Sequence, residues 1–306
     1  MRNLFIVAYL FAILASFFQS AFASDISILT TLPGEDTSLL TQEEIQSNSY
    51  LLFSGEIQKG DAEKLAKVLM QAHPFGTMLI LDSPGGDVEE SLRIVLLAKT
   101  LHLGTVVESG GTCASACFFI WLAGDNRIAD GTINGRMPKR VAGYLGLHRP
   151  YLKSDPAKKS SSTDAEARQH DVMQKISAYL RNEDVPQRLI DLMMSRPSND
   201  IYWMTQDDID QLGTFSPSHE ELLISRCGYN RNMFDGHTIT IQMARQRGDS
   251  AAEVRENERW KALVSAFGKC QVTAFPDQAE ESVTNTERLR KGWRPWLKSK
   301  VAGKKQ

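Results

Sequence analysis

The stretch GGTCASAC, residues 110–117, stands directly before an apolar run from Phe118 to Ala123. The small residues on both sides of Ser115 let the chain turn sharply from a strand into a helix, which leaves the hydroxyl open to a substrate. The free N–H groups and the positive dipole end of that helix favour negative charge that develops nearby. Because a serine alone is a weak nucleophile, the chain must also supply a base and a group that orients it.

Short β-rich runs alternate with helical patterns around this stretch. Strands are expected at residues 50–53, 78–81 and 105–107, and helices at 61–73 and from Asp87 onward. Apolar residues recur at helical spacing in both helical segments, and Asp87 with Glu90 has the spacing of a capping box. Because parallel strands need crossover connections, this order predicts an α/β domain with a mainly parallel sheet.

Two of the motifs lie where parallel strands end. Ser115 follows the third expected strand, and the pair Gly85-Gly86 follows the second. Ligands bind at the carboxyl ends of the strands in such sheets, and glycines let backbone N–H groups approach a ligand closely. Alone, the glycine pair would indicate a tight turn; together with Ser115 it indicates a site.

His148 is the histidine best placed to serve as a base. It follows a strand-like run, Tyr144 to Leu147, and precedes Arg149-Pro150, which ends the strand. A histidine at a strand end can reach a serine hydroxyl at the neighbouring strand end. The other five histidines lie at expected helix ends or in polar sequence: His73, His102, His170, His219 and His237.

Three motifs together resemble a known family. They are SPGG at residues 83–86, GTCASAC at 111–117 and GLHRP at 146–150. Their order and spacing resemble the proteolytic subunits of Clp proteases, and more closely the exported bacterial Clp-like proteins of the wider Clp/crotonase superfamily. The resemblance covers residues 50–215 and implies an α/β fold of repeated β-β-α units with a mainly parallel sheet.

Position by position, this resemblance implies that Ser115 is the nucleophile and His148 the general base. The backbone amides of Gly86 and Ala116 would form the oxyanion hole. The strand end at Gly85 would bind the substrate, because an extended groove there can pair with a peptide backbone. The implied activity is that of a serine peptidase with a peptide or protein substrate, no cofactor and no metal.

The acid of the implied triad falls less directly on this sequence. In the family it precedes a short segment that opens a helix and ends in glycine, here Thr205 to Gly213. Aligning on these two residues puts the family aspartate nearest Ile201, so the preceding residue, Asp200, is the candidate acid. Thr205 resembles a helix N-cap, and the aspartates that follow it are expected to be first-turn carboxylates.

The chain departs from the family in three places. Cysteines flank the serine, a basic stretch occupies residues 135–140, and a polar insertion at 153–168 stands where the family has an inter-subunit handle. The insertion is expected to be flexible. A stacked-ring assembly is therefore in doubt, and a monomer or a smaller homo-oligomer is expected.

The ends of the chain indicate export and an appendage. Residues 1–23 have the charged start, apolar stretch and small-residue cleavage pattern of a signal peptide, with cleavage expected after Ala23. No later stretch is long enough to span a membrane, so a periplasmic or secreted protein is expected. The expected divisions are a loosely packed lead-in at 24–48, the Clp/crotonase-like domain at 49–215, and a C-terminal appendage with a basic tail at 216–306.

Composition and cysteine content limit the partners. With 42% apolar residues, 24% charged residues and a formal net charge of −2, the chain lacks the basic excess that nucleic-acid binding needs. Its four cysteines allow three pairings, of which Cys227–Cys270 is preferred because both lie in the appendage. A Cys113–Cys117 bond would form only if the turn geometry permits it. Metal binding is not expected, because no histidine or carboxylate cluster has ligand spacing.

Three functions remain open on the sequence. An exported serine hydrolase with the triad Ser115, His148 and Asp200 is the first, and a non-catalytic interaction module that kept the fold is the second. A crotonase-type acyl-CoA enzyme is the third; export argues against it, because coenzyme A is cytosolic. A Ser–Lys dyad is a variant of the first, but no lysine occupies an obvious matching position.

Overall fold

The computed structural model describes residues 24–29, 50–71, 77–108, 110–129, 144–151, 162–234 and 237–291. The chain divides into two compact units, Met1–Ser216 with Ser282–Gln306, and Pro217–Glu281. The expected signal peptide, most of the expected lead-in, the basic stretch and the C-terminal tail lie outside the described residues. The expected appendage, 216–306, differs from the second unit at its end, because the chain returns to the first unit at Ser282.

A five-stranded sheet in the order β1-β2-β3-β4-β6 forms the centre of the first unit. Its strands are β1 (Asp25–Leu29), β2 (Tyr50–Ser54), β3 (Met78–Asp82), β4 (Gly104–Val106) and β6 (Arg127–Ile128). All neighbours are parallel except β1, which pairs antiparallel with β2. The predicted α/β class with a mainly parallel sheet is therefore confirmed. Strand β1 departs from the expectation, because it lies in the stretch expected to be loosely packed.

A second, three-stranded sheet holds the strand ends near Ser115. It contains β5 (Thr112–Ala114), β7 (Tyr144–Leu147) and β8 (Tyr202–Trp203); β5 and β7 are parallel, and β8 is antiparallel to β7. Two isolated parallel bridges extend this pattern: Ile57, after β2, pairs with Gly86, after β3, and Ser83 pairs with Cys113 of β5. Two strand segments thus precede each crossover helix, which is the repeated β-β-α arrangement that the resemblance implies.

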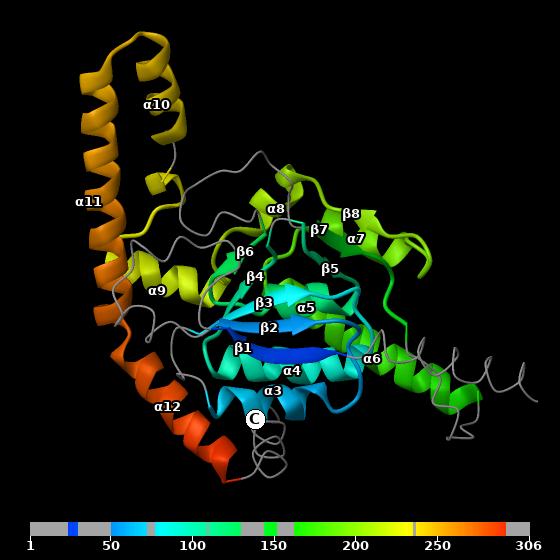
Figure 1. Ribbon diagram of the computed structural model, residues 1–306. Helices are drawn as coiled ribbons and strands as arrows, with labels where there is room; N and C mark the ends of the chain where they lie inside the picture. The colour runs from blue at the N-terminus through cyan, green and yellow to red at the C-terminus, as the bar shows by residue number, and fades with distance from the viewer. Residues whose placement is uncertain are drawn as a thin grey trace, which may run out of the picture. The chain divides into compact units, whose positions relative to one another are not determined.

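Three helices cover one face of the five-stranded sheet. They are α3 (Asp61–Leu69), α4 (Val88–Thr100) and α5 (Ala116–Leu122), and Figure 1 shows α3 and α4 side by side along the strands. Alternate strand residues such as Leu51 and Phe53 join the helices in the large core, while Tyr50 belongs to a smaller cluster on the other face. Every residue of α5 is buried, as expected for the apolar run after the serine.

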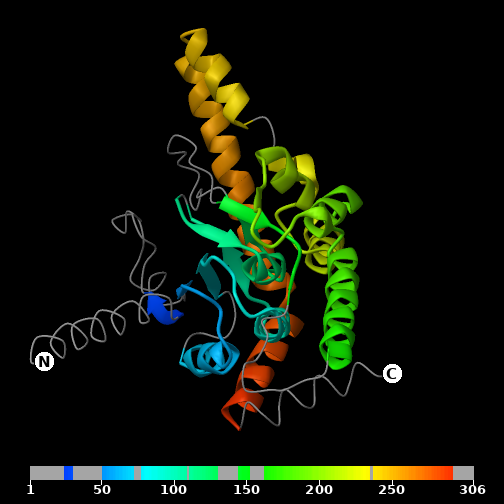
Figure 2. The ribbon, with the colours of Figure 1, turned by 90° about the vertical axis from the view of Figure 1, so that its right-hand side faces the viewer.

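The helices after β7 are α6 (Ser162–Asn182), α7 (Gln187–Ser195) and α8 (Gln206–Leu212). Figure 2 shows α6, in green, on the opposite side of the first unit from the blue strand β1. Helix α6 begins at Ser162, so the last part of the insertion expected to be flexible is helical, whereas residues 152–161 lie outside the described residues.

Helix α8 starts as the sequence predicts, with Thr205 as its N-cap. Thr205 and Asp208 form a capping box, which satisfies two free N–H groups of the first turn. Burial would raise the pKa of Asp208, but hydrogen bonds from Tyr202, Thr205 and Arg188 hold this pKa at about 2. The ionised carboxylate therefore links α7, β8 and α8 next to the second sheet.

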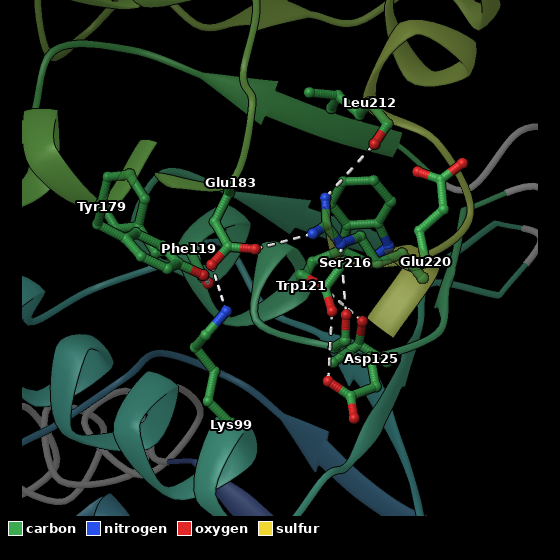
Figure 3. A network of polar contacts seen from close by, with 12 residues as sticks. Lys99, Phe119, Trp121, Asp125, Tyr179, Glu183, Leu212, Ser216 and Glu220 are labelled. Carbon is green, nitrogen blue, oxygen red and sulfur yellow. Dashed lines mark hydrogen bonds and ion pairs between the residues drawn. The ribbon is translucent and has the colours of Figure 1, made fainter. Parts of the chain in front are cut away.

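A buried polar network around Glu183 joins several elements of the first unit (Figure 3). The Arg127 guanidinium donates to the Glu183 carboxylate at 2.8 Å and to the carbonyls of Gly124 and Leu212 at 3.3 and 3.4 Å. Lys99 of α4 pairs with the other oxygen of Glu183. Burial lowers the pKa of Arg127, and the charge of Glu183 opposes that shift. The Glu183 carboxylate, which follows α6, thus connects β6 with α4, and Arg127 also reaches the last residue of α8.

The second unit is helical. It contains α9 (Pro217–Cys227), the short η3 (Arg231–Phe234), α10 (His237–Gln246), α11 (Ser250–Ala274) and the start of α12 (Pro276–Arg290). In both views α10 lies beside α11 (Figures 1 and 2), and the two helices are in contact. The predicted disulfide Cys227–Cys270 is confirmed and joins α9 to α11, with 5.8 Å between the Cα atoms.

The second half of α12 belongs to the first unit. Ser282 and Asn285 donate hydrogen bonds to the carbonyls of Leu101 and Thr100, at 3.1 and 3.2 Å. These carbonyls lie at the end of α4, where a helix leaves acceptors without intrahelical donors. None of the described helices is both long and apolar enough to cross a lipid bilayer.

Candidate active site

Ser115 lies on a strained turn between β5 and α5. Its backbone has φ 57° and ψ −122°, which is a rare conformation for a residue with a side chain. Its N–H donates to the carbonyl of Gly146 at 2.8 Å, and its side chain makes no capping hydrogen bond to α5. Strained strand-to-helix turns of this kind expose nucleophilic serines. The sequence prediction of a sharp turn at this residue is met.

Gly85 packs directly against this turn. A Cβ atom at Gly85 would lie 2.7 Å from the Ser115 Cβ and 2.6 Å from the carbonyl oxygen of Ala114. Gly85 also has a φ of 97°, which side chains rarely adopt. Glycine is therefore required here for two reasons, and the requirement brings the end of β3 against the serine.

The amides expected to form the oxyanion hole flank the same turn. Ala116 opens α5 directly after Ser115, and Gly86 follows Gly85 with its own φ of 146°. Gly86 and Ile57 form an isolated parallel bridge, in which the N–H of Asp87, the residue after Gly86, donates to the Ile57 carbonyl at 2.8 Å. In the described part of the chain neither the Gly86 amide nor the Ala116 amide donates a hydrogen bond, so both can serve an oxyanion.

His148 is buried, with 6% of its surface exposed, and follows the end of β7. Its Nδ1 lies 3.0 Å from the carbonyl oxygen of Arg149. Because a carbonyl oxygen can only accept, Nδ1 must carry the proton and donate it. The neutral imidazole then has its lone pair on Nε2, which is the protonation state of a general base. The ring of Tyr151, which is half-exposed, lies 6.1 Å away.

The strand register brings Ser115 and His148 to the same edge of the second sheet. Ala114 of β5 is opposite Gly146 of β7 in a parallel pair, so the serine and the histidine both follow the carboxyl ends of adjacent strands. Neighbouring strands lie about 4.8 Å apart. The two residues that the sequence proposed as nucleophile and base therefore follow neighbouring strand ends of one sheet.

Asp200, the candidate acid, has a different partner. Its carboxylate lies 2.6 Å from Nη1 of Arg196, and about half of its side chain is exposed. In the described part of the chain the Nδ1 of His148 binds only the Arg149 carbonyl. The structure thus does not join Asp200 to His148 by a hydrogen bond. Ile201, the residue that the alignment matched to the family aspartate, packs its Cγ2 against Gly146, two residues before His148.

Two features of the site go beyond the sequence expectations. The carbonyl of Arg149 has no signature in a sequence, because every residue carries one. The cysteines on both sides of the serine were visible, and their pairing was left open. They form a disulfide, with 5.1 Å between the Cα atoms of Cys113 and Cys117.

A half-buried carboxyl lies on the segment that leads from β4 into this turn. Glu108 accepts a hydrogen bond from the amide of Gly111 through its backbone carbonyl, at 2.8 Å. Burial raises the pKa of its side chain.

Among the described residues no group of three or more histidine, cysteine or acidic side chains could hold a metal ion.

Comparisons with known proteins give structural matches at low sequence identity. No protein-family model matches the chain, and no curated protein matches it. Similar solved structures include ClpP1 from Listeria monocytogenes, at 17% identity over 54% of this chain and 88% of that chain, with a TM-score of 0.37. A mutant of that protein matches at 18% identity with a TM-score of 0.41 over the same shares.

A third similar structure is a mutant of the 1510-N membrane-bound stomatin-specific protease. It matches at 15% identity over 54% of this chain and 75% of that chain, with a TM-score of 0.36. Because these values are low, the function proposed for this chain depends on its own residues and their geometry.

Proposed function

We propose that this protein is an exported serine hydrolase that cleaves peptides or proteins, with Ser115 as nucleophile and His148 as general base. One observation carries the proposal: Ser115 stands on a strained turn at the edge where His148 holds its proton on Nδ1. A strained backbone at Ser115 is expected if the turn must expose the hydroxyl. A proton on Nδ1 is expected if Nε2 must accept the proton of that hydroxyl.

The reaction follows from these positions. Nε2 of His148 accepts the hydroxyl proton as Oγ of Ser115 forms a bond to the substrate carbonyl carbon. The amides of Gly86 and Ala116 donate to the oxygen that becomes negative, and one such donor is worth roughly 10² to 10³ in rate. The imidazolium then gives its proton to the leaving amine, and the C–N bond breaks. Water, deprotonated by His148, releases the acyl group from Ser115.

The Arg149 carbonyl takes the orienting role in this proposal. It fixes the ring and the tautomer of His148, as the acid of a triad does, but it carries no full negative charge. The imidazolium is therefore less stabilised than beside a carboxylate. Asp200 would take this role only if its carboxylate left Arg196 and reached Nδ1.

A peptide substrate is supported by the backbone groups at the end of β3. Gly85 and Gly86 present main-chain atoms beside the serine, and main-chain hydrogen bonds are how extended peptides pair with a strand edge. No stacked ring is invoked; we expect a monomer or a small homo-oligomer. Neither nucleic acid nor a cofactor has a part in the proposal.

Export is proposed from the first residues of the sequence. Cleavage after Ala23 would leave Ser24 as the first residue. The Ser24 hydroxyl donates to the buried carboxylate of Asp61 at 2.6 Å, directly before β1. Cleavage at this position would keep the hydrogen bond between Ser24 and Asp61. Mass spectrometry of protein recovered from the periplasm or the medium should give a chain that starts at Ser24.

The test is covalent labelling with a fluorophosphonate probe, which reports an activated serine without a known substrate. We expect the wild-type protein to be labelled, Ser115→Ala to be unlabelled, and His148→Ala to be labelled at least about 10²-fold more slowly. Circular dichroism controls for folding.

The contrary result would be an unlabelled wild-type protein that is folded. It would favour the second candidate, a non-catalytic interaction module. That candidate is supported by the pairing of Asp200 with Arg196 rather than with His148.

A further inference from the structure

The disulfide Cys113–Cys117 encloses Ser115. Cys113 is the central residue of β5, Cys117 lies in the first turn of α5, and Ser115 is halfway between them. Both cysteines are completely buried and belong to the large core, whereas Ser115 is partly exposed. The covalent link therefore lies on the core side of the turn, and the hydroxyl lies on its accessible side.

We propose that this disulfide is a positioning element that holds Ser115 in its strained conformation. This inference rests on the proposed hydrolase function, because it concerns the geometry of the same serine. The disulfide joins the strand before the turn to the helix after it. It thereby holds the Cα atoms of Cys113 and Cys117 5.1 Å apart, and the backbone of Ser115 must turn within this distance.

The need for such a link follows from the backbone of Ser115. A residue with a side chain leaves this φ and ψ region unless its surroundings hold it there. Non-covalent contacts help, among them the hydrogen bond from the Ser115 N–H to the Gly146 carbonyl at 2.8 Å and the close approach of Gly85. Gly85 also lies close to the amide nitrogen of Ala116, and the Phe118 N–H donates to the Ser115 carbonyl at 3.1 Å. Among these restraints, the disulfide is the covalent one, and it ties β5 directly to α5.

Relaxation of the turn would affect more than the hydroxyl. The amide of Ala116 belongs to the peptide that follows Ser115, so a change in the ψ angle of Ser115 rotates that N–H. The proposed nucleophile and one of its two oxyanion donors would then leave their positions together. A small rearrangement of this turn should therefore reduce reactivity by more than the loss of one contact would.

The burial of both sulfur atoms limits their role. A buried disulfide cannot exchange with a thiol or contact a substrate unless the turn opens first. The inferred role is thus geometric, and variants test it better than a reducing agent does. The second disulfide, Cys227–Cys270, offers a matched control, because it closes a loop in the other unit.

The experiment compares fluorophosphonate labelling rates of folded proteins. We expect Cys113→Ala/Cys117→Ala to be labelled at least about tenfold more slowly than wild type, which corresponds to about 1.4 kcal/mol. The midpoint of its rate against pH should stay unchanged, because His148 keeps its partner. Cys227→Ala/Cys270→Ala should be labelled at the wild-type rate. If the double variant does not fold, Cys117→Ala alone removes the link with a smaller change in volume.

A second readout separates this inference from the hydrolase proposal. The Ser115 amide should exchange with deuterium faster in the Cys113→Ala/Cys117→Ala variant, while the amides of β3 should exchange as in wild type. The positioning role would be overturned if the wild type is labelled and the Cys113→Ala/Cys117→Ala variant has the same labelling rate and the same Ser115 exchange rate. An unlabelled wild type would overturn the hydrolase function instead, and the Ser115 exchange rate would then decide whether the disulfide holds the turn.

Discussion

His148 depends on a backbone carbonyl for its orientation, and this has a consequence for Asp200. The carbonyl of Arg149 lies 3.0 Å from Nδ1, while the carboxylate of Asp200 lies 2.6 Å from Arg196. Two exposed side chains in an ion pair contribute little to stability, typically about 0–1 kcal/mol. Asp200 therefore contributes little either to the fold or to the imidazole in this arrangement.

We expect Asp200→Asn to lower the fluorophosphonate labelling rate by less than about tenfold, whereas loss of a working triad acid costs on the order of 10⁴. Arg196→Gln serves as the control, because it breaks the same ion pair and leaves the carboxylate free. A loss of several orders of magnitude in Asp200→Asn alone would mean that the carboxylate reaches His148 during the reaction.

At the residue scale, the sequence predicted the nucleophile and the base but could not predict the partner of the base. His148 follows β7, which the sequence predicted at its residues, whereas Ser115 follows β5, a three-residue strand that comes after the strand expected at 105–107. The acid depended on a register of one residue, and Ile201 rather than Asp200 packs against Gly146 of β7. Because adjacent residues of a strand face opposite sides, a shift of one position changes which side chain faces the histidine.

At the element scale, the approach of β3 to the serine turn can be tested at Gly85. Gly85→Ala would place a methyl group 2.7 Å from the Ser115 Cβ at a φ of 97°. We expect it to abolish labelling and to lower the free energy of unfolding by about 2–5 kcal/mol, the sum of backbone strain and overpacking. Chemical denaturation measures the second effect.

Gly60→Ala is the matched control for backbone strain. Gly60 has a φ of 102°, close to that of Gly85, but no atom lies within 4 Å of the position of its Cβ. It should lose about 1 kcal/mol from strain alone and keep the wild-type labelling rate. Equal labelling of both variants would show that the approach of Gly85 to Ser115 has no part in reactivity.

The elements themselves were largely predictable, and the exceptions share a physical cause. Strands β2, β3 and β7 and helices α3 and α4 have apolar residues that face the large core, and α5 is recognisable as a wholly apolar run. Strand β1 was missed because only five residues of a polar stretch form it, and it pairs at a sheet edge. The start of α6 was missed because most of its first residues are exposed, so no apolar pattern marks them.

At the scale of the whole molecule, the two disulfides should differ in their effects: Cys113–Cys117 mainly on reactivity, and Cys227–Cys270 mainly on stability. In the chain-entropy account, a bond between cysteines 43 positions apart stabilises by about 4 kcal/mol, and one between cysteines four positions apart by about 2 kcal/mol. The longer loop belongs to the second unit, whose buried apolar residues are few. They include Leu223, Tyr229, Ile241, Ala244, Phe267 and Phe275.

A small core of this kind depends strongly on a covalent link. We therefore expect Cys227→Ala/Cys270→Ala to lower the free energy of opening of the second unit by about 4 kcal/mol. Hydrogen exchange of the amides in α9 and α11 measures it, with the amides of β3 as an internal reference in the other unit. Unchanged exchange in α9 and α11 would mean that ring contacts such as Tyr229 with Phe267, at 5.6 Å, hold these helices without the disulfide. Faster exchange in β3 as well would mean that the two units unfold together rather than separately.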